Sequence, residues 1–320
     1  MNIIEDIDLR RFMARQESQS IRPASDFVED AIERLEKGSA VFGDQMPWSK
    51  TADKFRFRPS ELTILAAENG SGKSTLQTQL ALWLAAEGKK TLIASMEMPG
   101  SATVAKMLRQ GAGISNPSRE DVRKVMRYTN DRIWIYDQIG SVQPDRIIAM
   151  IHWAAEELGI DHIMIDSLVK CGVDSEHNEP QNRFVDALAW AAKEHKIHIH
   201  LVHHVRKAAD EKAVPDKYSV KGSGGIVDLA DNLLIVARNK AKEAKIRLKE
   251  ANPLSDVDFD PQEPDCFIRV AKQRHGEWEG LFNFWFDKGS QQWIPEYGYG
   301  PMPFPPPEAK AMPSMLGAVA

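Results

Sequence analysis

The residues best suited to chemistry lie in one glycine-rich stretch, residues 67–75 (AENGSGKST). An apolar run at 62–66 precedes it and an Ala/Leu-rich run follows it, so a strand and a helix are expected on its two sides. Backbone N–H groups in such a turn, together with the positive end of the helix dipole, bind phosphate. Lys73 would reach the β- and γ-phosphates, and the Ser74 hydroxyl would bind Mg²⁺. The pattern predicts a P-loop, with Ala67 at the usual first glycine; the alternative is a glycine-rich turn that arose by chance. The residues predicted to hold the nucleotide are Glu68, Asn69, Gly70, Ser71, Gly72, Lys73, Ser74 and Thr75.

Two acidic residues follow predicted strands. In open α/β sheets, functional residues lie at the carboxyl ends of the strands. Glu97 follows the apolar run at 91–95 and would act as the general base on a water that attacks a γ-phosphate; the alternative is a solvated or helix-capping glutamate. Asp166 ends the apolar run at 162–165, a Walker-B pattern in which the carboxylate orients the Mg²⁺ shell, partly through water.

Histidines are concentrated at and before a third strand end. His203 and His204 follow the predicted strand at 197–202, where a histidine near the γ-phosphate could sense the nucleotide state. The alternative is a structural pair of strand-end histidines. A metal site in this region is disfavoured, because strand alternation spreads the side chains over both faces of the sheet. The cluster comprises His195, His198, His200, His203 and His204.

Two loops are expected at the same edge. Residues 205–225 form a long basic loop, and its lysines and glycine-freed N–H groups suit the phosphate backbone of a nucleic acid. The loop at 170–180 is polar and acidic, so it is interpreted as solvated. The predicted DNA contacts are Arg206, Lys207, Lys217, Lys221, Gly222, Ser223 and Gly224.

A second pair of cations lies near the end of the chain. Lys272 and Arg274 are one residue apart where a strand meets a turn, so both leave the same face of the strand. They could reach a γ-phosphate of a neighbouring subunit in the manner of an arginine finger. The alternative is a solvent-exposed basic turn.

The elements that must position these residues alternate between strands and helices from residue 61 onward. This alternation predicts an α/β fold with a mostly parallel sheet. An antiparallel pair at 266–272 and 280–287 is expected at the sheet edge, and the charged segment 240–263 is interpreted as a surface loop. The predicted strands are 62–66, 91–95, 132–136, 162–165, 197–202 and 232–237, and the predicted helices are 74–86, 101–110, 119–128, 144–158 and 180–195.

The two ends of the chain differ from this core. Residues 1–23 are interpreted as a flexible arm, and residues 295–320, rich in Pro, Gly, Met and Ala, as a disordered tail. Residues 24–52 are expected to form a linker helix over 26–37, with a capping-box-like start at Asp26 and Glu29, and a following loop. The helix has an apolar stripe that packs on its own domain or on a neighbouring subunit. The motor domain is expected over 53–294.

Composition narrows the class of protein. The 320 residues carry a net charge of −5, so the chain is not one coated in nucleic acid, although a local basic channel is compatible with this charge. Only two cysteines are present, without a CxxC pair, so neither a disulfide framework nor a zinc ribbon is expected. No membrane segment or signal peptide is visible, and a cytoplasmic location is expected, in the host if the gene is phage-encoded.

The order of these motifs resembles the RecA-like P-loop NTPase motor of DnaB-family replicative helicases. It also resembles the helicase half of phage primase-helicases and of the Twinkle type, and the His-His pair is similar to that of RepA-type plasmid helicases. The resemblance covers about residues 24–294 and rests on 68–75, Glu97 with Met98 and Pro99, Asp166 with Ser167, His203 with His204, 222–224, and Lys272 with Arg274.

The resemblance implies a hexameric ring that uses ATP, or another NTP or dNTP, with Mg²⁺ to move 5′ to 3′ on single-stranded DNA. It implies that Lys272 and Arg274 act in trans, that His204 reads the γ-phosphate, and that Arg238 and Phe286 hold the base. The linker helix would dock on the adjacent protomer, and a separate primase or polymerase would be a partner. The acidic loop at 170–180 departs from the family. Nothing upstream resembles a primase or the family's helical N-terminal domain, so a minimal motor of the phage kind is expected. The alternatives are a RecA/RadA-like recombinase and a non-motor replication ATPase or loader.

Overall fold

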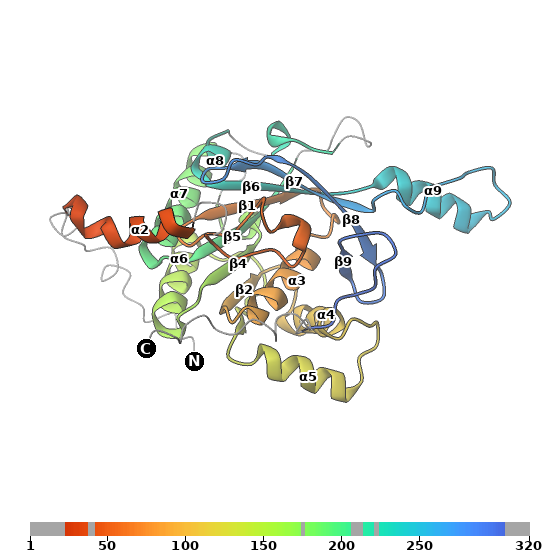
Figure 1. Ribbon diagram of the computed structural model, residues 1–320, viewed down its shortest axis with the longest axis horizontal. Helices are drawn as coiled ribbons and strands as arrows, with labels where there is room; N and C mark the ends of the chain where they lie inside the picture. The colour runs from red at the N-terminus through yellow and green to blue at the C-terminus, as the bar shows by residue number, and fades with distance from the viewer. Residues whose placement is uncertain (1–22, 38–41, 174–176, 206–213, 221–223, 305–320) are drawn as a thin grey trace.

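A mixed sheet forms the centre of the molecule (Figure 1). The computed structural model describes residues 23–37, 42–173, 177–205, 214–220 and 224–304. Its strands are ordered β3-β2-β4-β5-β1-β6-β7-β8-β9; the pairs among β1 to β6 are parallel and β7, β8 and β9 add on antiparallel. The predicted fold class is therefore confirmed. The strands are β1 Leu62–Ala67, β2 Thr91–Ser95, β3 Ile133–Ile135, β4 His162–Asp166, β5 His198–His204, β6 Asn232–Arg238, β7 Cys266–Gln273, β8 Gly280–Asp287 and β9 Gln292–Ile294.

Helices cover both faces of the sheet. One side packs against α3, α4 and α5, and the other against α6, α7 and α8 (Figure 1). The described helices are α2 Val28–Lys37, α3 Lys73–Ala86, α4 Gly100–Ala112, α5 Arg119–Thr129, α6 Pro144–Trp153, α7 Asn178–His195, α8 Gly224–Leu229 and α9 Lys240–Ala251. A π-helical turn, Ala154–Leu158, prolongs α6, so both lie within the predicted helix 144–158. No described helix is long and apolar enough to cross a membrane.

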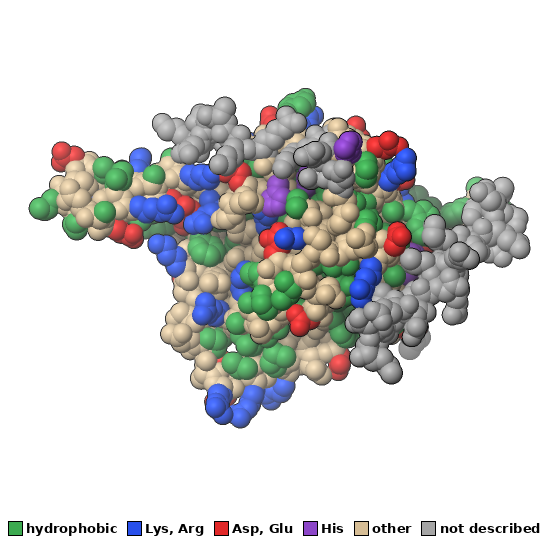
Figure 2. All heavy atoms as spheres, turned by 180° about the vertical axis from the view of Figure 1, so that it is seen from behind, with side chains coloured by type: hydrophobic (Ala, Val, Ile, Leu, Met, Phe, Trp, Pro, Cys, Tyr) green, Lys and Arg blue, Asp and Glu red, His purple; other side chains and the backbone are tan. Residues whose placement is uncertain are grey.

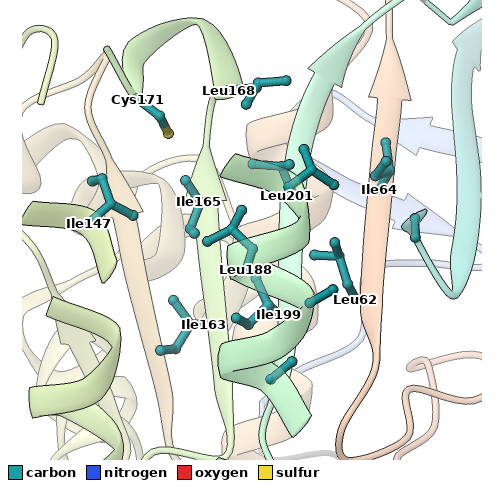
Figure 3. Packing of buried hydrophobic residues seen from close by; sticks show 14 of the residues in the cluster. Leu62, Ile64, Ile147, Ile163, Ile165, Leu168, Cys171, Leu188, Ile199 and Leu201 are labelled. Carbon is teal, nitrogen blue, oxygen red and sulfur yellow. The ribbon is translucent and has the colours of Figure 1, made fainter. Parts of the chain in front are cut away.

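The side chains of β1 divide the core into two clusters. Because successive strand residues point to opposite faces, Leu62 and Ile64 join the cluster beneath α6, α7 and α8 (Figure 3). Leu65 and Ala67 join the other cluster, beneath α3 and α4. All six residues of β1 are buried, as expected for a central parallel strand covered on both faces. This rigid strand delivers the chain to the glycine-rich turn.

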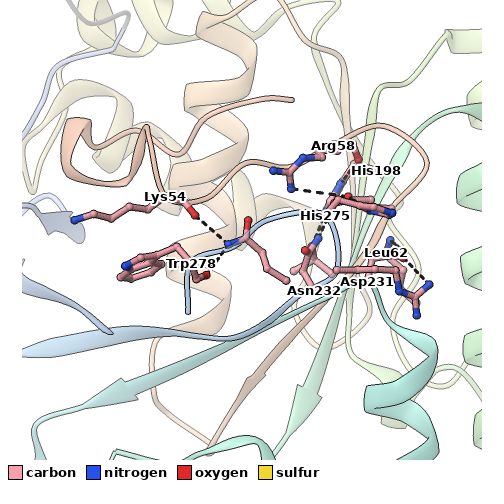
Figure 4. A network of polar contacts seen from close by, with 12 residues as sticks. Lys54, Arg58, Leu62, His198, Asp231, Asn232, His275 and Trp278 are labelled. Atoms are coloured by element: carbon pink, nitrogen blue, oxygen red, sulfur yellow. Dashed lines mark hydrogen bonds and ion pairs between the residues drawn. The ribbon is translucent and has the colours of Figure 1, made fainter. Parts of the chain in front are cut away.

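A polar network holds the amino ends of the central strands together (Figure 4). The Asp231 carboxylate, 1% exposed, accepts a hydrogen bond from the Leu62 N–H at 2.9 Å. Asn232 donates to Glu61 at 2.8 Å, and the His275 ring lies 2.8 Å from the same carboxylate. These contacts fix the edge of the sheet opposite the glycine-rich turn.

The predicted histidine cluster contributes to the core. His198 lies 2.9 Å from the Thr63 hydroxyl, and its ring stacks near those of His162 and His200. Burial lowers the pKa of His198 to about 3, and it lowers the pKa of His200 well below the usual value, so both rings are neutral at physiological pH. No group of three His, Cys, Asp or Glu side chains in the described part of the chain could hold a metal ion.

Four sequence predictions need correction. The segment 240–263 is not a plain loop, because it contains α9. Residues 295–304 are not disordered: Phe304 is 5% exposed and its N–H donates to the Gly111 carbonyl at 3.1 Å. The helix α7 begins at Asn178, inside the predicted loop 170–180. The predicted linker helix starts as a 3₁₀ turn, Ala24–Phe27, whose N-cap is Pro23 without a side-chain cap, so Asp26 does not cap it. Residues 1–22 and 305–320 lie outside the described part.

Candidate nucleotide-binding site

The turn between β1 and α3 has the backbone that phosphate binding requires. Gly70 and Gly72 adopt φ values of +75° and +89°, in the left-handed region that favours glycine, and Gly72 is the N-cap of α3. The Lys73 ammonium donates to the carbonyl of Glu68 at 2.9 Å and to that of Ala67 at 3.3 Å. Burial lowers the pKa of Lys73, and the charges of Asp166, Glu97 and Glu68 oppose this shift. Lys73 is therefore held over the turn, beside three carboxylates.

Asp166, the last residue of β4, lies directly beside the start of α3. The Ser74 hydroxyl donates to its carboxylate at 2.6 Å. Burial raises the pKa of Asp166 and the nearby Glu97 charge raises it further, while Ser74 and the lysines 73 and 106 act in the opposite direction. A hydroxyl and a carboxylate in contact are the oxygen ligands that Mg²⁺ prefers, and the cation would relieve the cost of burying the carboxylate charge. Ser74 and Asp166 therefore fit the predicted Mg²⁺ site.

Glu97 lies two residues beyond β2, the neighbour of β4 in the sheet. Its side chain is exposed, and the Ser167 hydroxyl donates to the Glu97 carboxylate at 3.2 Å. Since β2 and β4 are parallel, their carboxyl ends bring Glu97 to the same edge as Asp166. An oriented, solvent-accessible carboxylate in this position can accept a proton from a water molecule.

His204 is the last residue of β5 and pairs in register with Ala67, which leads into the glycine-rich turn. Val205 follows, and its N–H donates to the Ala67 carbonyl at 3.2 Å. Val205 also forms an antiparallel bridge with Val220, so the two ends of the predicted basic loop meet beside the P-loop. These backbone contacts join the loop to the edge of the sheet that carries the P-loop.

Part of that loop is described. Lys217 lies in a 3₁₀ turn, Lys217–Ser219, that Asp216 caps, and Gly224 is the first residue of α8. The other predicted DNA contacts, Arg206, Lys207, Lys221, Gly222 and Ser223, lie outside the described residues.

Lys272 and Arg274 lie at the opposite edge of the sheet. Lys272 pairs with Leu233 near the start of β6, and its ammonium donates to the Ala230 carbonyl at 2.7 Å. Arg274 forms an ion pair with the buried Asp231 at 3.0 Å. The P-loop follows the far end of β1, where Ala67 pairs with Val236. Neither cation is therefore brought together with the P-loop of its own chain.

A cavity of about 440 Å³ opens above the P-loop. Arg238 and Phe286, which the resemblance assigns to the base, both line it, and the Arg238 guanidinium donates to the Gly70 carbonyl at 3.1 Å. Trp293 forms another part of the lining, with its ring 3.5 Å from the position that a Cβ on Gly72 would occupy. A Cβ at position 72 would only touch the indole at van der Waals distance, so the positive φ is what favours glycine there.

Two parts of the site have no counterpart in the sequence predictions. Lys106 on α4 is half-buried; burial lowers its pKa and the Asp166 charge opposes this. One turn further along α4, the Gln110 amide donates to the Thr75 carbonyl at 2.8 Å, so this face of α4 borders the phosphate end of α3. In the sequence, only the helical spacing of Lys106 from Thr103 and Gln110, within the predicted helix 101–110, placed these three side chains on one face. The second part is the cavity-facing side of α9, which the interpretation of 240–263 as a loop concealed.

The chain is similar in sequence and in fold to known proteins. Residues 52–210 match the AAA_25 family model, described as an AAA domain. A DNA helicase/primase of Enterobacteria phage T3 is 26% identical over 204 residues, which are 57% of this chain and 36% of the relative. Two solved structures match at 14% identity and 86% coverage of this chain. The first, with a TM-score of 0.66 over 67% of its length, is described as a DnaB-like replicative helicase and its interactions with primase. The second is described as an ATPase domain, with a TM-score of 0.69 over 99% of its length. The sequence matches are to an AAA domain and to a phage helicase/primase, and the two solved structures show a shared fold.

These likenesses have a defined extent. The chain spans about a third of the length of the phage T3 relative, and the likeness to the solved structures is one of fold. Both matches cover 86% of this chain, so the shared fold includes most of the central sheet and of the helices on its two faces.

Proposed function

We propose that this chain is the ATP-driven motor of a ring-shaped, hexameric replicative DNA helicase that moves 5′ to 3′ on single-stranded DNA. The observation that carries the proposal is the separation of two sets of residues. Lys73, Asp166 and Glu97 meet at one edge of the sheet, whereas Lys272 and Arg274 lie at the other. A site divided in this way is complete only between two copies of the chain, arranged head to tail, and such an arrangement forms a ring when the rotation between copies closes.

The residues of the P-loop edge have distinct roles in hydrolysis. The N–H groups of residues 70–74 and the Lys73 ammonium would bind the phosphates, and Ser74 with Asp166 would hold Mg²⁺, which supplies positive charge to the phosphate oxygens. Glu97 would accept the proton of the attacking water. Arg274 of the adjacent copy would neutralise charge that develops on the transferred phosphoryl group.

His204 and the basic loop would couple hydrolysis to movement on DNA. His204 pairs with Ala67, and the loop that follows it returns to Val205 through the Val220 bridge. A change in the contact between His204 and the γ-phosphate would therefore reach the backbone of the loop within one residue. The loop would bind the DNA phosphates in the ring channel.

A separate primase or polymerase is the expected protein partner. The phage T3 relative is named a helicase/primase, and one structural neighbour is described with its interactions with primase. These names support the class of partner.

The division of the site can be tested by mixing two inactive variants. Lys73→Ala lacks the phosphate-binding lysine but retains Arg274, whereas Arg274→Ala retains the P-loop. Each variant alone should lose DNA-stimulated ATP hydrolysis, and their mixture should recover part of it, because some interfaces then join an intact P-loop to an intact arginine. Arg274→Lys is a second variant that keeps a cation near Asp231, in case Arg274→Ala unfolds.

The alternatives predict different results. A non-motor ATPase or loader would show weak hydrolysis that DNA does not stimulate, and Arg274→Ala would leave turnover intact. A recombinase of the RecA/RadA type would form filaments with nucleotide, whereas the proposed helicase forms closed rings. Electron microscopy of the protein with nucleotide and single-stranded DNA separates these two assemblies.

A further inference from the structure

The helix α9 presents one side to the cavity above the P-loop. It follows β6 and projects from the body of the molecule beside β8 (Figure 1). The cavity-lining residues on it occur at positions i, i+3, i+4 and i+7, which is one face of an α-helix. These residues are Glu243, Ile246, Arg247 and Glu250.

The base of α9 is anchored to the sheet. The Asn239 side chain caps the helix by accepting from the Lys242 N–H at 3.0 Å. Lys242 is only 4% exposed and pairs with Asp265 at 2.9 Å, and the Asp265 carboxylate accepts from the Phe286 N–H at 3.0 Å. The helix is thereby tied to the strand that carries the predicted base-binding Phe286.

The same helix is tied to the P-loop. Lys240 forms an ion pair with Glu68, the second residue of the glycine-rich stretch. Arg238 donates to the Gly70 carbonyl and pairs with Glu243 of α9 at 2.5 Å. The cavity face of α9 therefore starts at the phosphate-binding turn and continues outward from it.

We propose that α9 is the outer wall of the nucleotide site and contacts the base, with Ile246 against its face and Arg247 and Glu250 at its polar edge. This inference rests on the proposed function, in which the P-loop binds the triphosphate. The phosphates would occupy the turn, so the remaining space, lined by Ile246 and Phe286 among charged groups, receives the nucleoside. Its volume of about 440 Å³ lies within the range of small-ligand sites, which combine apolar walls with a few polar groups.

The charges of this segment disfavour DNA as the ligand of α9. Lys240 and Lys242 already pair with carboxylates. The cavity face of α9 carries two acidic side chains, Glu243 and Glu250, and one basic side chain, Arg247. The segment that follows the helix is acidic, and red side chains mark the outer part of the projecting arm in Figure 2. Over residues 240–263, six acids outnumber five cations, so this segment lacks the surplus of cations that a nucleic-acid backbone requires.

The test compares Ile246→Ala with Leu248→Ala, a matched control on the same helix. Leu248 is 56% exposed and does not line the cavity. Binding of ATP and of inorganic tripolyphosphate, which has no base, is measured for each protein by calorimetry. Ile246→Ala should weaken ATP binding roughly tenfold, from the loss of one apolar contact, and change tripolyphosphate binding less than about twofold. Leu248→Ala should change neither.

A second variant examines the contact between Arg247 and the polar edge of the base. Arg247 has a side chain that is 78% exposed, so Arg247→Ala should fold normally. It should change the ratio of the affinities for ATP and UTP by roughly threefold or more, because the two bases differ at the edge that Arg247 would face. The ratio should stay the same in Leu248→Ala.

The outcomes separate the inference from the proposed function. If the wild-type protein binds neither ATP nor tripolyphosphate, the proposed function fails and the inference falls with it. If both ligands bind, the phosphate-binding turn on which the inference rests is present. The inference alone is then overturned if Ile246→Ala weakens both ligands equally or neither, or if Arg247→Ala leaves the base preference unchanged.

Discussion

Glu97 combines solvent access with a fixed orientation. The Ser167 hydroxyl holds it at 3.2 Å, at the sheet edge shared with Asp166. A general base in this position contributes about 10²–10⁴-fold to the rate, so Glu97→Gln should reduce ATP hydrolysis by that factor and leave the ATP Kd within about threefold. Single-turnover hydrolysis and nucleotide binding are measured in parallel. Glu120→Gln on α5, a glutamate whose side chain is 74% exposed, is the control and should match the wild type.

Asp166 is expected to destabilise the protein in the absence of Mg²⁺. Because burial raises the pKa of its carboxyl above the usual 3.8, the folded state binds this proton more tightly than the unfolded chain does. This contribution to stability is complete below about pH 4 and is lost as the pH rises through the folded-state pKa. The Asp166→Asn side chain cannot ionise, so this variant does not lose stability as the pH rises. Its Tm should therefore exceed that of the wild type by an amount that grows with pH, roughly 2–4 °C for each 1 kcal/mol of stability that the wild type loses.

Thermal melts of both proteins in EDTA, from acidic to neutral pH, test this expectation. With Mg²⁺ and ATP the difference should shrink or reverse, since bound Mg²⁺ favours the ionised carboxylate. A constant difference in Tm at every pH would mean that Asp166 ionisation is not the cause.

The residues at strand ends could be predicted because parallel strands bring their carboxyl ends to one edge. Asp166 and Glu97 each follow an apolar run, and the structure places both at that edge with Lys73. The partners of Lys272 and Arg274 could not be predicted. They are carbonyls of 227, 228 and 230 and the carboxylate of Asp231, more than forty positions away, and only the antiparallel pairing of β6 and β7 joins them.

At the scale of the element, α9 depends on Lys242. Lys242→Ala removes the ion pair to Asp265 and the hydrogen bond to the Pro261 carbonyl at 3.0 Å. Loss of this partly buried pair should detach the base of α9 and raise hydrogen exchange over 240–265 by roughly tenfold, since about 1.4 kcal/mol of local stability corresponds to that factor.

Lys245→Ala, on an exposed position of the same helix, is the control and should leave the exchange rates of 240–265 unchanged. Exchange over α3 should stay as in the wild type in both variants. If the effect spread equally over the whole chain, Lys242 would support global rather than local stability.

The sequence of α9 indicates a helix, but the many charged residues of 240–263 led to its interpretation as a surface loop. The segment KAKEAKIRLKEA consists almost entirely of good helix formers, and its cavity-facing residues follow helical spacing. The tail presents the opposite case. Its Pro- and Gly-rich composition predicts disorder, but the Met302 N–H donates to the Gln292 side chain at 2.8 Å, and Phe304 packs in the core beneath α3 and α4. Composition does not reveal contacts with partners so distant in the sequence.

At the scale of the whole molecule, the two functional edges lie at opposite ends of the central strands. β1 runs from Leu62, beside the Asp231 and Arg274 network, to Ala67 at the P-loop. A second copy that places its Arg274 edge on the P-loop edge of the first repeats the same contact, and the repeated contact gives a ring when the rotation between copies closes. The exposed apolar residues Phe27, Val28 and Leu35 of the amino-terminal helix provide a further surface that a neighbour could cover.

Strand displacement on a forked duplex decides whether this chain uses nucleotide hydrolysis to separate DNA strands. The wild-type protein with ATP and Mg²⁺ should release the displaced strand and require a free 5′ single-stranded arm, while Lys73→Ala should release none. ATP hydrolysis by the wild type should rise when single-stranded DNA is added. If the wild-type protein displaces no strand and its hydrolysis does not respond to DNA, the helicase account is contradicted.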